Sequence, residues 1–259
     1  MIHVNPLYSV AGVLVGLLVG LTGVGGGSLM TPLLVLVFGF HPATAVGTDL
    51  LYASATKVAG TGVHGSRGTV DWRIVRRLAS GSLPASLVTL AALSIAHRHA
   101  ENTDHAIVVV LGAALVLTGI ATFFRARIVA RLTVAFERVS ERRVPALTVL
   151  LGIALGALVT LTSVGAGALG MTALLVLYPR VPLARLVGSD IAHAVPLTLI
   201  AGVGQWAMGS VNGSLLVSLL IGSIPGIVVG SLIASRISDR VLVPVLATTL
   251  VIVGGKLVF

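Results

Sequence analysis

The chain has no cysteine, few charged residues and few aromatic residues, and each shortage excludes a class of protein. With no cysteine among 259 residues, the chain cannot form disulfides, thiolate metal sites, iron–sulfur clusters or cysteine nucleophiles. Charged residues make up 10% and aromatic residues 4%, whereas about a quarter of the residues in a soluble domain are charged. So few charges cannot cover a water-soluble surface of this size. A soluble enzyme, a nucleic-acid binder and a disordered chain are all excluded.

Apolar sequence is abundant instead. Hydrophobic residues make up 56% of the chain, and the mean hydropathy is +1.08. Because a helical crossing needs about 20 apolar residues, the chain holds at most about eight crossings. The sequence therefore predicts an all-α polytopic membrane protein. The apolar stretches cover residues 7–40, 44–65, 78–96, 106–124, 145–178, 187–208, 214–234 and 241–258.

The formal net charge is +9, from 17 Lys and Arg against 8 Asp and Glu. These charges lie in short patches between the apolar stretches, a distribution that sets membrane topology. No basic face with interleaved aromatic residues is present, so the lipid bilayer and not a nucleic acid is the expected partner. The first Lys or Arg is Lys57. Since a signal peptide needs a basic leading region, we expect no cleavable signal and expect the first segment to stay in the mature protein.

Three motifs of the first half recur in the same order in the second half. The glycine-rich residues 16–27 match residues 152–167, with 22–27 and 162–167 at an offset of 140. Gly-Thr-Asp at 47–49 and Gly-Thr-Val-Asp at 68–71 match Gly-Ser-Asp at 188–190 and Gly-Ser-Val-Asn at 209–212, at an offset of 141. This indicates an internal duplication, which is typical of secondary transporters. The predicted parts are a first transmembrane repeat (1–124), a cytoplasmic Arg-rich linker (125–144) and a second transmembrane repeat (145–259).

The basic loops predict how the two repeats are oriented. Loops rich in Arg are expected in the cytoplasm, and the acidic loop around residues 101–104 is expected outside. All basic loops fall on one side only if the first segment of the second half enters the membrane and returns. The same treatment of the first half makes the repeats inverted, each with a Gly-broken or re-entrant first segment; two parallel four-helix repeats with about eight spans are the alternative. The loops expected inside carry Arg67, Arg73, Arg76 and Arg77, the linker, Arg180 and Arg185, and Arg236 and Arg240.

Dense glycine clusters interrupt the first apolar segment of each half. Such clusters break a helix, because glycine adopts backbone conformations that a Cβ forbids. Unwound backbone at membrane depth needs a protein interior or a water-filled cavity around it, and the helix that starts after the break presents free N–H groups that suit an anion. Close helix packing is the alternative role of such glycines, and it is the one expected for Gly16, Gly20, Gly152 and Gly156. The candidate substrate-binding residues are Thr22, Gly23, Gly25, Gly26, Gly27, Ser28, Thr48, Lys57, Thr162, Ser163, Gly165, Gly167 and Ser189.

Ionisable side chains within apolar segments are the candidates for proton coupling. An acid at membrane depth indicates function by default, but Asp49 and Asp190 are also well placed to cap their helices. Lys57 follows Asp49 by two helical turns on the same face, where it would attract an anion or pair with Asp49. His64 and His193 are further candidates, although a lone His is more often a structural residue. No metal-binding pattern is present, and no cofactor is expected.

The motifs together resemble the sulfite exporter TauE/SafE family of bacterial membrane transporters. The resemblance rests on G-x-x-x-G-x-T-G-V-G-G-G-S-x-x-x-P at residues 16–32, A-V-G-T-D-L at 45–50 and G-T-V-D-W at 68–72, with a weaker copy in the second half that ends in G-S-I-P-G at 222–226. It implies transport of small anions such as sulfite or organosulfonates, commonly outward. The second half departs from the pattern: Ala166 and Ala168 replace Gly and Ser, and Thr172 stands opposite Pro32.

The leading hypothesis is a secondary transporter that moves a small anion across the bacterial inner membrane by alternating access, with Asp49 or Asp190 relaying protons. One alternative is a channel-like anion uniporter. A second is a membrane accessory subunit that does not transport. No paired nucleophile and base is visible, so an enzyme is not expected. A homodimer is compatible with the sequence.

Overall fold

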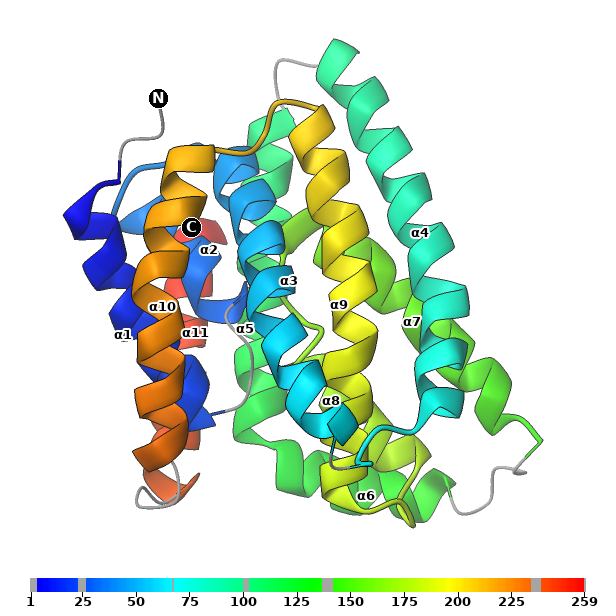
Figure 1. The fold of residues 1–259 in the computed structure, drawn as a ribbon. Coiled ribbons are helices and arrows are strands. Elements are labelled where there is room, and N and C mark those ends of the chain that lie inside the picture. The colour runs from blue at the N-terminus through cyan, green and yellow to red at the C-terminus, as the bar shows by residue number, and fades with distance from the viewer. Residues whose placement is uncertain are drawn as a thin grey trace.

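The computed structural model describes residues 4–22, 27–66, 68–99, 103–136, 142–233 and 239–258 and is nearly all helical there (Figure 1). The connections between helices that lie within the described residues are short turns. The helices are α1 (Pro6–Thr22), α2 (Gly27–Leu36), α3 (Pro42–Ser66), α4 (Trp72–His99), α5 (Thr103–Phe123), α6 (Arg125–Phe136), α7 (Val144–Thr162), α8 (Ala168–Leu177), α9 (Leu183–Ala207), α10 (Gly213–Ile233) and α11 (Asp239–Val258).

Several helices are long and apolar enough to cross a membrane, which confirms the predicted multi-pass membrane protein. Four qualify individually, at Trp72–Ala96, Val144–Thr162, Leu183–Ala207 and Gly213–Gly230. A fifth span is counted if α5 and α6, bent by 75° at their junction, are taken together. Large apolar side chains also lie on the outside of the bundle, among them Val88, which is 70% exposed. Such a surface suits lipid contact and not water.

The first two helices of each half form a hairpin. In the second half, Thr148 near the start of α7 hydrogen-bonds Tyr178 just after α8, with 2.7 Å between the hydroxyl oxygens. In the first half, the Tyr8 ring of α1 packs edge-on against Phe38, beyond the end of α2, with 5.2 Å between ring centroids. Each hairpin therefore returns to the end of the bundle at which it began. The 10-residue α8 is about 15 Å long, roughly half of the hydrocarbon thickness.

Each hairpin packs against a helix of the other half. Helix α1 lies along α10, and α7 lies along α4. At both crossings a glycine faces a backbone carbonyl so closely that an added Cβ would collide with it. This close approach is how small residues bring membrane helices together. The corresponding approaches are Gly12 on Leu219 and Gly16 on Ser223 in one crossing, and Gly152 on Leu78 and Gly156 on Ser82 in the other.

Helices α3 and α9 lie together at the centre and run antiparallel (Figure 1). Gly202 of α9 packs on Leu51 of α3, whereas Gly60 of α3 packs on Ile191 of α9. Asp49 lies on α3 and Asp190 on α9, so the packing of this central pair sets the relative depth of the two acids.

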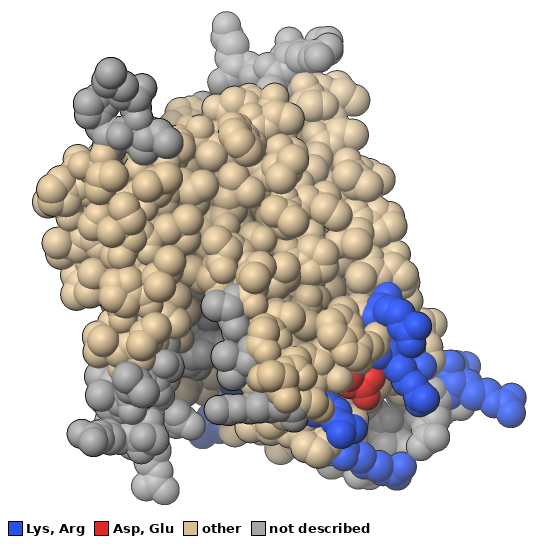
Figure 2. All heavy atoms as spheres, in the orientation of Figure 1, with Lys and Arg blue, Asp and Glu red and all other residues tan. Residues whose placement is uncertain are grey.

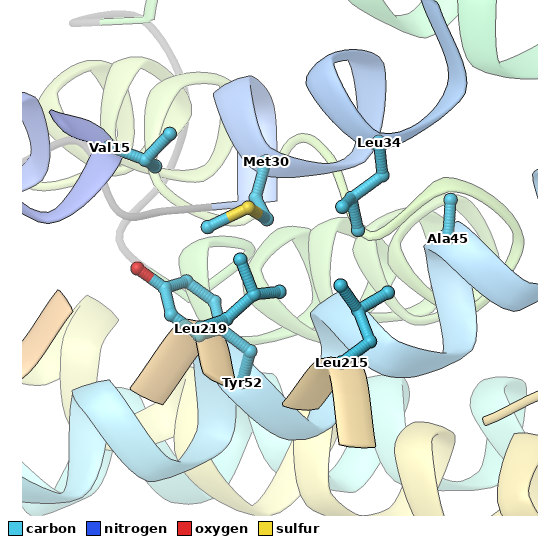
Figure 3. Packing of buried hydrophobic residues seen from close by; sticks show 7 residues of the cluster. All are labelled: Val15, Met30, Leu34, Ala45, Tyr52, Leu215 and Leu219. Carbon is cyan, nitrogen blue, oxygen red and sulfur yellow. The ribbon is translucent and has the colours of Figure 1, made fainter. Parts of the chain in front are cut away.

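One apolar cluster joins the first hairpin to α3 and α10 (Figure 3). Met30 and Leu34 of α2 pack over Tyr52 of α3 and over Leu215 and Leu219 of α10. A related cluster around the second hairpin joins α8 and α9 to α4. These clusters fix each short helix beside the central pair. The second cluster comprises Ile74, Leu78, Met171, Leu174 and Leu186.

Arginines gather at one end of the bundle, whereas the rest of the face shown in Figure 2 is nearly free of charge. We call this end the basic end, and we name the opposite end the uncharged end after its 208–212 turn, which carries no charged residue. The region predicted as a linker contains a real element, α6, which lies across the basic end. Arg127 of α6 stacks over the Phe124 ring at 5.7 Å. The basic end carries Arg73, Arg76, Arg77, Arg127, Arg131, Arg142, Arg143, Arg180 and Arg185.

Candidate functional site

The second glycine cluster breaks the helix as predicted. Helix α7 ends at Thr162, Ser163 takes a left-handed φ of 60°, and Gly165 has φ of 110°. An L residue rarely adopts such a backbone, so glycine at position 165 allows the chain to turn. Helix α8 then starts at Ala168, with the N–H groups of Leu169 and Gly170 bonded to the Gly165 carbonyl. The break is buried inside the protein, as unwound backbone in a membrane protein requires.

Thr162, Ser163 and Gly167 take different places in this break. The Thr162 hydroxyl donates to the Leu158 carbonyl and accepts from the Val164 N–H, so it satisfies the broken backbone. Ser163 is buried, and its hydroxyl has no hydrogen-bond partner among the described residues. Gly167 forms the N-cap of α8. Of these three residues, Ser163 is therefore the one whose hydroxyl is available to hydrogen-bond a ligand.

The first glycine cluster lies largely outside the described residues. Helix α1 ends at Thr22 and α2 begins at Gly27; Gly23, Gly25 and Gly26, like the side chains of Thr22 and Ser28, are not described. The two helices form a hairpin around this gap, as α7 and α8 do around theirs.

Asp49 is fully buried beside the start of α2 and the second break. The Thr31 hydroxyl of α2 donates a hydrogen bond to its Oδ2, while Oδ1 has no partner among the described residues. The unpaired Ser163 hydroxyl lies near the same carboxyl group. Asp49 therefore does not cap its own helix. Its hydrogen bond joins α3 to the first hairpin, and the carboxyl group lies beside the break in the second hairpin.

Asp190 occupies the corresponding place on α9, with different neighbours. Its Oδ1 lies against the backbone of Gly170 in the first turn of α8. A Cβ added to Gly170 would lie only 3.0 Å from this oxygen. That oxygen has no hydrogen-bond partner among the described residues. Lys57 and Arg125 lie within electrostatic range of the carboxyl group.

Lys57 lies between the two acids. It is half-buried and within electrostatic range of both Asp190 and Asp49. From the facing positions on α3 and α9 and a rise of 1.5 Å per residue, the two acids are about 20 Å apart along the helices. Asp49 is nearer the uncharged end and Asp190 nearer the basic end. One cation is therefore shared by two acids at different depths.

Thr48 and Ser189 support neighbouring loops. The Thr48 hydroxyl accepts a hydrogen bond from the Asn212 N–H at 3.1 Å, and the Ser189 hydroxyl accepts one from the Asp71 N–H at 2.8 Å. Asp71 and Asn212 in turn accept bonds from the first turns of α4 and α10. These contacts explain why the Gly-Thr/Ser-Asp motif and the Gly-x-Val-Asp/Asn motif recur together. Contact with substrate stays a prediction for both hydroxyls.

The two histidines lie in different surroundings. His64 is half-buried near the basic end of α3, with Nδ1 2.8 Å from the Thr69 hydroxyl. His193 is fully buried on α9, with Nε2 2.7 Å from the Ser82 hydroxyl of α4. Its Nδ1 has no partner among the described residues. Where the chain is described, no three His, Asp or Glu side chains come together as metal ligands would.

Sequence reasoning missed Thr31, and a signal for it exists. Residues 30–36 read M-T-P-L-L-V-L and residues 171–177 read M-T-A-L-L-V-L, so α2 and α8 correspond at an offset of 141. The one-residue gap therefore lies inside the break, and Ala173, not Thr172, stands opposite Pro32. Thr172 is then the counterpart of Thr31, but its hydroxyl donates to the Ala168 carbonyl of its own helix. Gly170 and Arg125, which come near Asp190 only in the fold, were missed as well.

Comparison with known proteins identifies the family of this fold. The family model for the sulfite exporter TauE/SafE matches residues 8–257. The chain belongs to the TauE/SafE family. It is 38% identical over 202 residues to the "Probable membrane transporter protein YjnA" of Bacillus subtilis (strain 168), covering 78% of this chain and 79% of that protein. No solved structure matches the chain.

Shorter matches agree with this assignment. A "Probable membrane transporter protein YunE" of Bacillus subtilis (strain 168) is 40% identical over 68 residues, which are 26% of this chain and 25% of that protein. A "Probable membrane transporter protein" of Xylella fastidiosa (strain 9a5c) is 44% identical over 64 residues, 24% of each chain. This TauE/SafE protein is therefore a membrane transporter, and the resemblance seen in its motifs is confirmed.

Proposed function

We propose that this protein is a secondary transporter that moves a small oxyanion, of the sulfite or organosulfonate class, by alternating access. The observation that carries the proposal is a series of buried polar atoms, at two depths of the central helices, that have no hydrogen-bond partner among the described residues. These atoms are Asp49 Oδ1, Ser163 Oγ and Asp190 Oδ1, with the half-buried Lys57 between the acids. Since buried polar groups are normally hydrogen-bonded, such a group suits a ligand that comes and goes.

The chemistry of the group favours an anion that travels with a proton. Lys57 supplies a positive charge, and the start of α8 adds the positive end of its helix dipole. The Leu169 and Gly170 N–H groups there already bond the Gly165 carbonyl. Asp49, Asp190, Lys57 and Arg125 carry charges that sum to zero, so a bound anion adds one uncompensated negative charge in a low-dielectric site. A proton on Asp49 or Asp190 removes that charge. The proposed transport cycle is therefore symport of an anion and a proton.

We also propose that the chain consists of two inverted repeats, 1–124 and 145–259, joined by the 125–144 linker. Corresponding helices α3 and α9 are antiparallel, and each first hairpin packs on the fourth main helix of the other half. These features support a two-fold axis in the membrane plane, the arrangement that alternating access uses. The basic end is assigned to the cytoplasm of the inner membrane by the positive-inside rule.

The proposal is tested with purified protein in liposomes that contain labelled sulfite. Gly165→Val should reduce sulfite flux at least about tenfold, because φ of 110° at this position is strained for any residue with a Cβ. Gly62→Val is the control, since no atom lies within 4 Å of a Cβ at that position of α3. Equal flux in both variants, with both inserted and folded, would refute the site. Saturable exchange supports a transporter, whereas single-channel current would identify a channel.

A further inference from the structure

A row of polar side chains runs through the interface of α4, α7 and α9, outside the proposed substrate site. His193 Nε2 lies 2.7 Å from Ser82 Oγ, and Ser86 Oγ lies 2.7 Å from Thr160 Oγ1. The Gln205 Nε2 donates to the Thr160 carbonyl over 3.4 Å. All five side chains are buried. We call these residues the polar column.

The polar column leads from Asp190 to the uncharged end. His193 follows Asp190 by three residues on α9, and Gln205 lies fifteen residues beyond Asp190, about 22 Å along the helix. Ser82 and Ser86 are one turn apart on the same face of α4. The column therefore links the acid nearer the basic end with the opposite end of the molecule.

Helix packing alone does not require this row. At the corresponding positions of the other half, by the 140- and 141-residue offsets, the chain has Tyr52, Ser223, Ile227, Gly20 and His64. Tyr52 and Ser223 lie near each other, as His193 and Ser82 do. Ile227 and Gly20, however, replace the hydroxyls of Ser86 and Thr160. A polar row thus continues in one interface only.

The column is narrow and has apolar walls. Val159, Leu197 and Ala201 belong to a buried apolar cluster beside it. A hydrated anion cannot enter such packing, whereas a proton passes along hydroxyl and imidazole groups. Two places require a bridging water. One is the turn between Ser82 and Ser86, where a water can hydrogen-bond both hydroxyls. The other is the end at Thr160, because Gln205 bonds the Thr160 carbonyl and not its hydroxyl.

At the end of the column nearest Asp190, two atoms can take part in passing a proton to this acid. His193 Nδ1 and Asp190 Oδ1 have no hydrogen-bond partner among the described residues, and side chains three residues apart on a helix are neighbours. When Nε2 receives a proton from Ser82, Nδ1 releases one to the carboxylate, so the ring changes tautomer with no net charge. Lys57 faces both groups, and Arg125 faces Asp190.

We propose that the polar column conducts protons between the uncharged end and Asp190, by a route separate from that of the anion. This inference rests on the proposed function, since it supplies the proton of the proposed symport. Ser82, Ser86 and Thr160 are thereby assigned to proton transfer and not to anion binding. Gln205, which bonds the Thr160 carbonyl, is assigned to positioning that end of the column.

The test compares two fluxes in sealed proteoliposomes that contain a pH-sensitive dye. Net sulfite uptake carries protons in the proposed cycle, whereas exchange of labelled for unlabelled sulfite moves none. Ser82→Ala and Ser86→Ala should each lower the proton flux that accompanies net uptake about tenfold, while exchange keeps at least half its rate. Ser223→Ala, the corresponding substitution in the other half, is the matched control and should change neither flux.

Each outcome bears on one proposal. Wild-type protein that moves sulfite without protons refutes the proposed symport and leaves the column without a function. Wild-type coupling that survives Ser82→Ala and Ser86→Ala overturns the column alone. If Ser82→Ala abolishes exchange as well, the proposal is judged on Ser86→Ala, because Ser86 lies farther from Asp190. If Ser86→Ala also abolishes exchange, both serines are needed for packing and the column is overturned.

Discussion

Lys57 is the residue on which the proposed anion site depends most. It lies within electrostatic range of two acids on different helices, and the corresponding position on α9 is Thr198. The two acids are therefore common to both halves, whereas the cation is not. This asymmetry places the positive charge off the centre of the molecule, nearer Asp190 than Asp49.

Replacing Lys57 by a residue of similar length without charge should weaken sulfite binding. We expect Lys57→Met to raise the KM for sulfite about tenfold or more, which corresponds to about 1.4 kcal/mol, because the anion then faces two acids without their shared cation. Lys256→Met is the control, since Lys256 is an exposed residue near the end of α11. A KM unchanged in Lys57→Met would exclude direct electrostatic binding by this side chain.

The contact between Thr31 and Asp49 gives a second prediction at this scale. Thr31→Val keeps the shape of the side chain but removes the hydroxyl that donates to Asp49, so proton-coupled sulfite uptake should become several-fold slower or change its pH dependence. Thr172→Val is the matched control, because the Thr172 hydroxyl bonds only its own helix. The measurement is the initial rate of uptake across a pH series, and identical profiles for the two variants would contradict the assignment.

At the scale of the element, the glycine faces decide how helices meet. Gly152 of α7 lies against the Leu78 carbonyl so closely that a Cβ would collide with backbone, which cannot move aside as a side chain can. We expect Gly152→Val to lower the thermal unfolding temperature in detergent by about 5 °C or more. Gly62→Val, in open space on α3, should change it by much less. Equal shifts in both variants would show that the α4–α7 crossing tolerates separation.

The elements also show what the sequence could and could not predict. Glycine density predicts the breaks, and the recurrence of Gly-Thr/Ser-Asp locates Asp49 and Asp190, because both signals are local. The partners of these residues are not local: Thr31, Gly170 and Arg125 reach the acids only after distant helices pack. The sequence predicts a linker where α6 lies because residues 125–143, with six Arg, are the most hydrophilic stretch of the chain. Its place across the basic end is a property of the fold.

At the scale of the whole molecule, the inverted arrangement makes a prediction about sidedness. Val37 follows α2 and Leu183 begins α9, shortly after α8; both side chains are exposed. In parallel repeats these two regions would lie on the same side of the membrane, whereas in inverted repeats they lie on opposite sides. The absence of cysteine makes the natural chain a ready background for single-cysteine labelling.

An impermeant maleimide should therefore label Val37→Cys in intact cells. Leu183→Cys should be labelled only after the membrane is opened, because the basic end is expected in the cytoplasm. Labelling of both variants from the same side would favour parallel repeats. Labelling of Val37→Cys only after opening, with Leu183→Cys labelled in intact cells, would keep the inversion and reverse the orientation.

The exchange of partners between the halves has a consequence for biosynthesis. Helix α1 rests on α10, and α4 rests on α7, so the tightest crossings join segments made far apart in time. A ribosome that has completed only α1 to α5 has produced glycine grooves whose partners do not yet exist. The early helices must therefore stay in the lipid without their tightest contacts until the late helices are inserted. A truncated first half should accordingly be a substrate for membrane proteases.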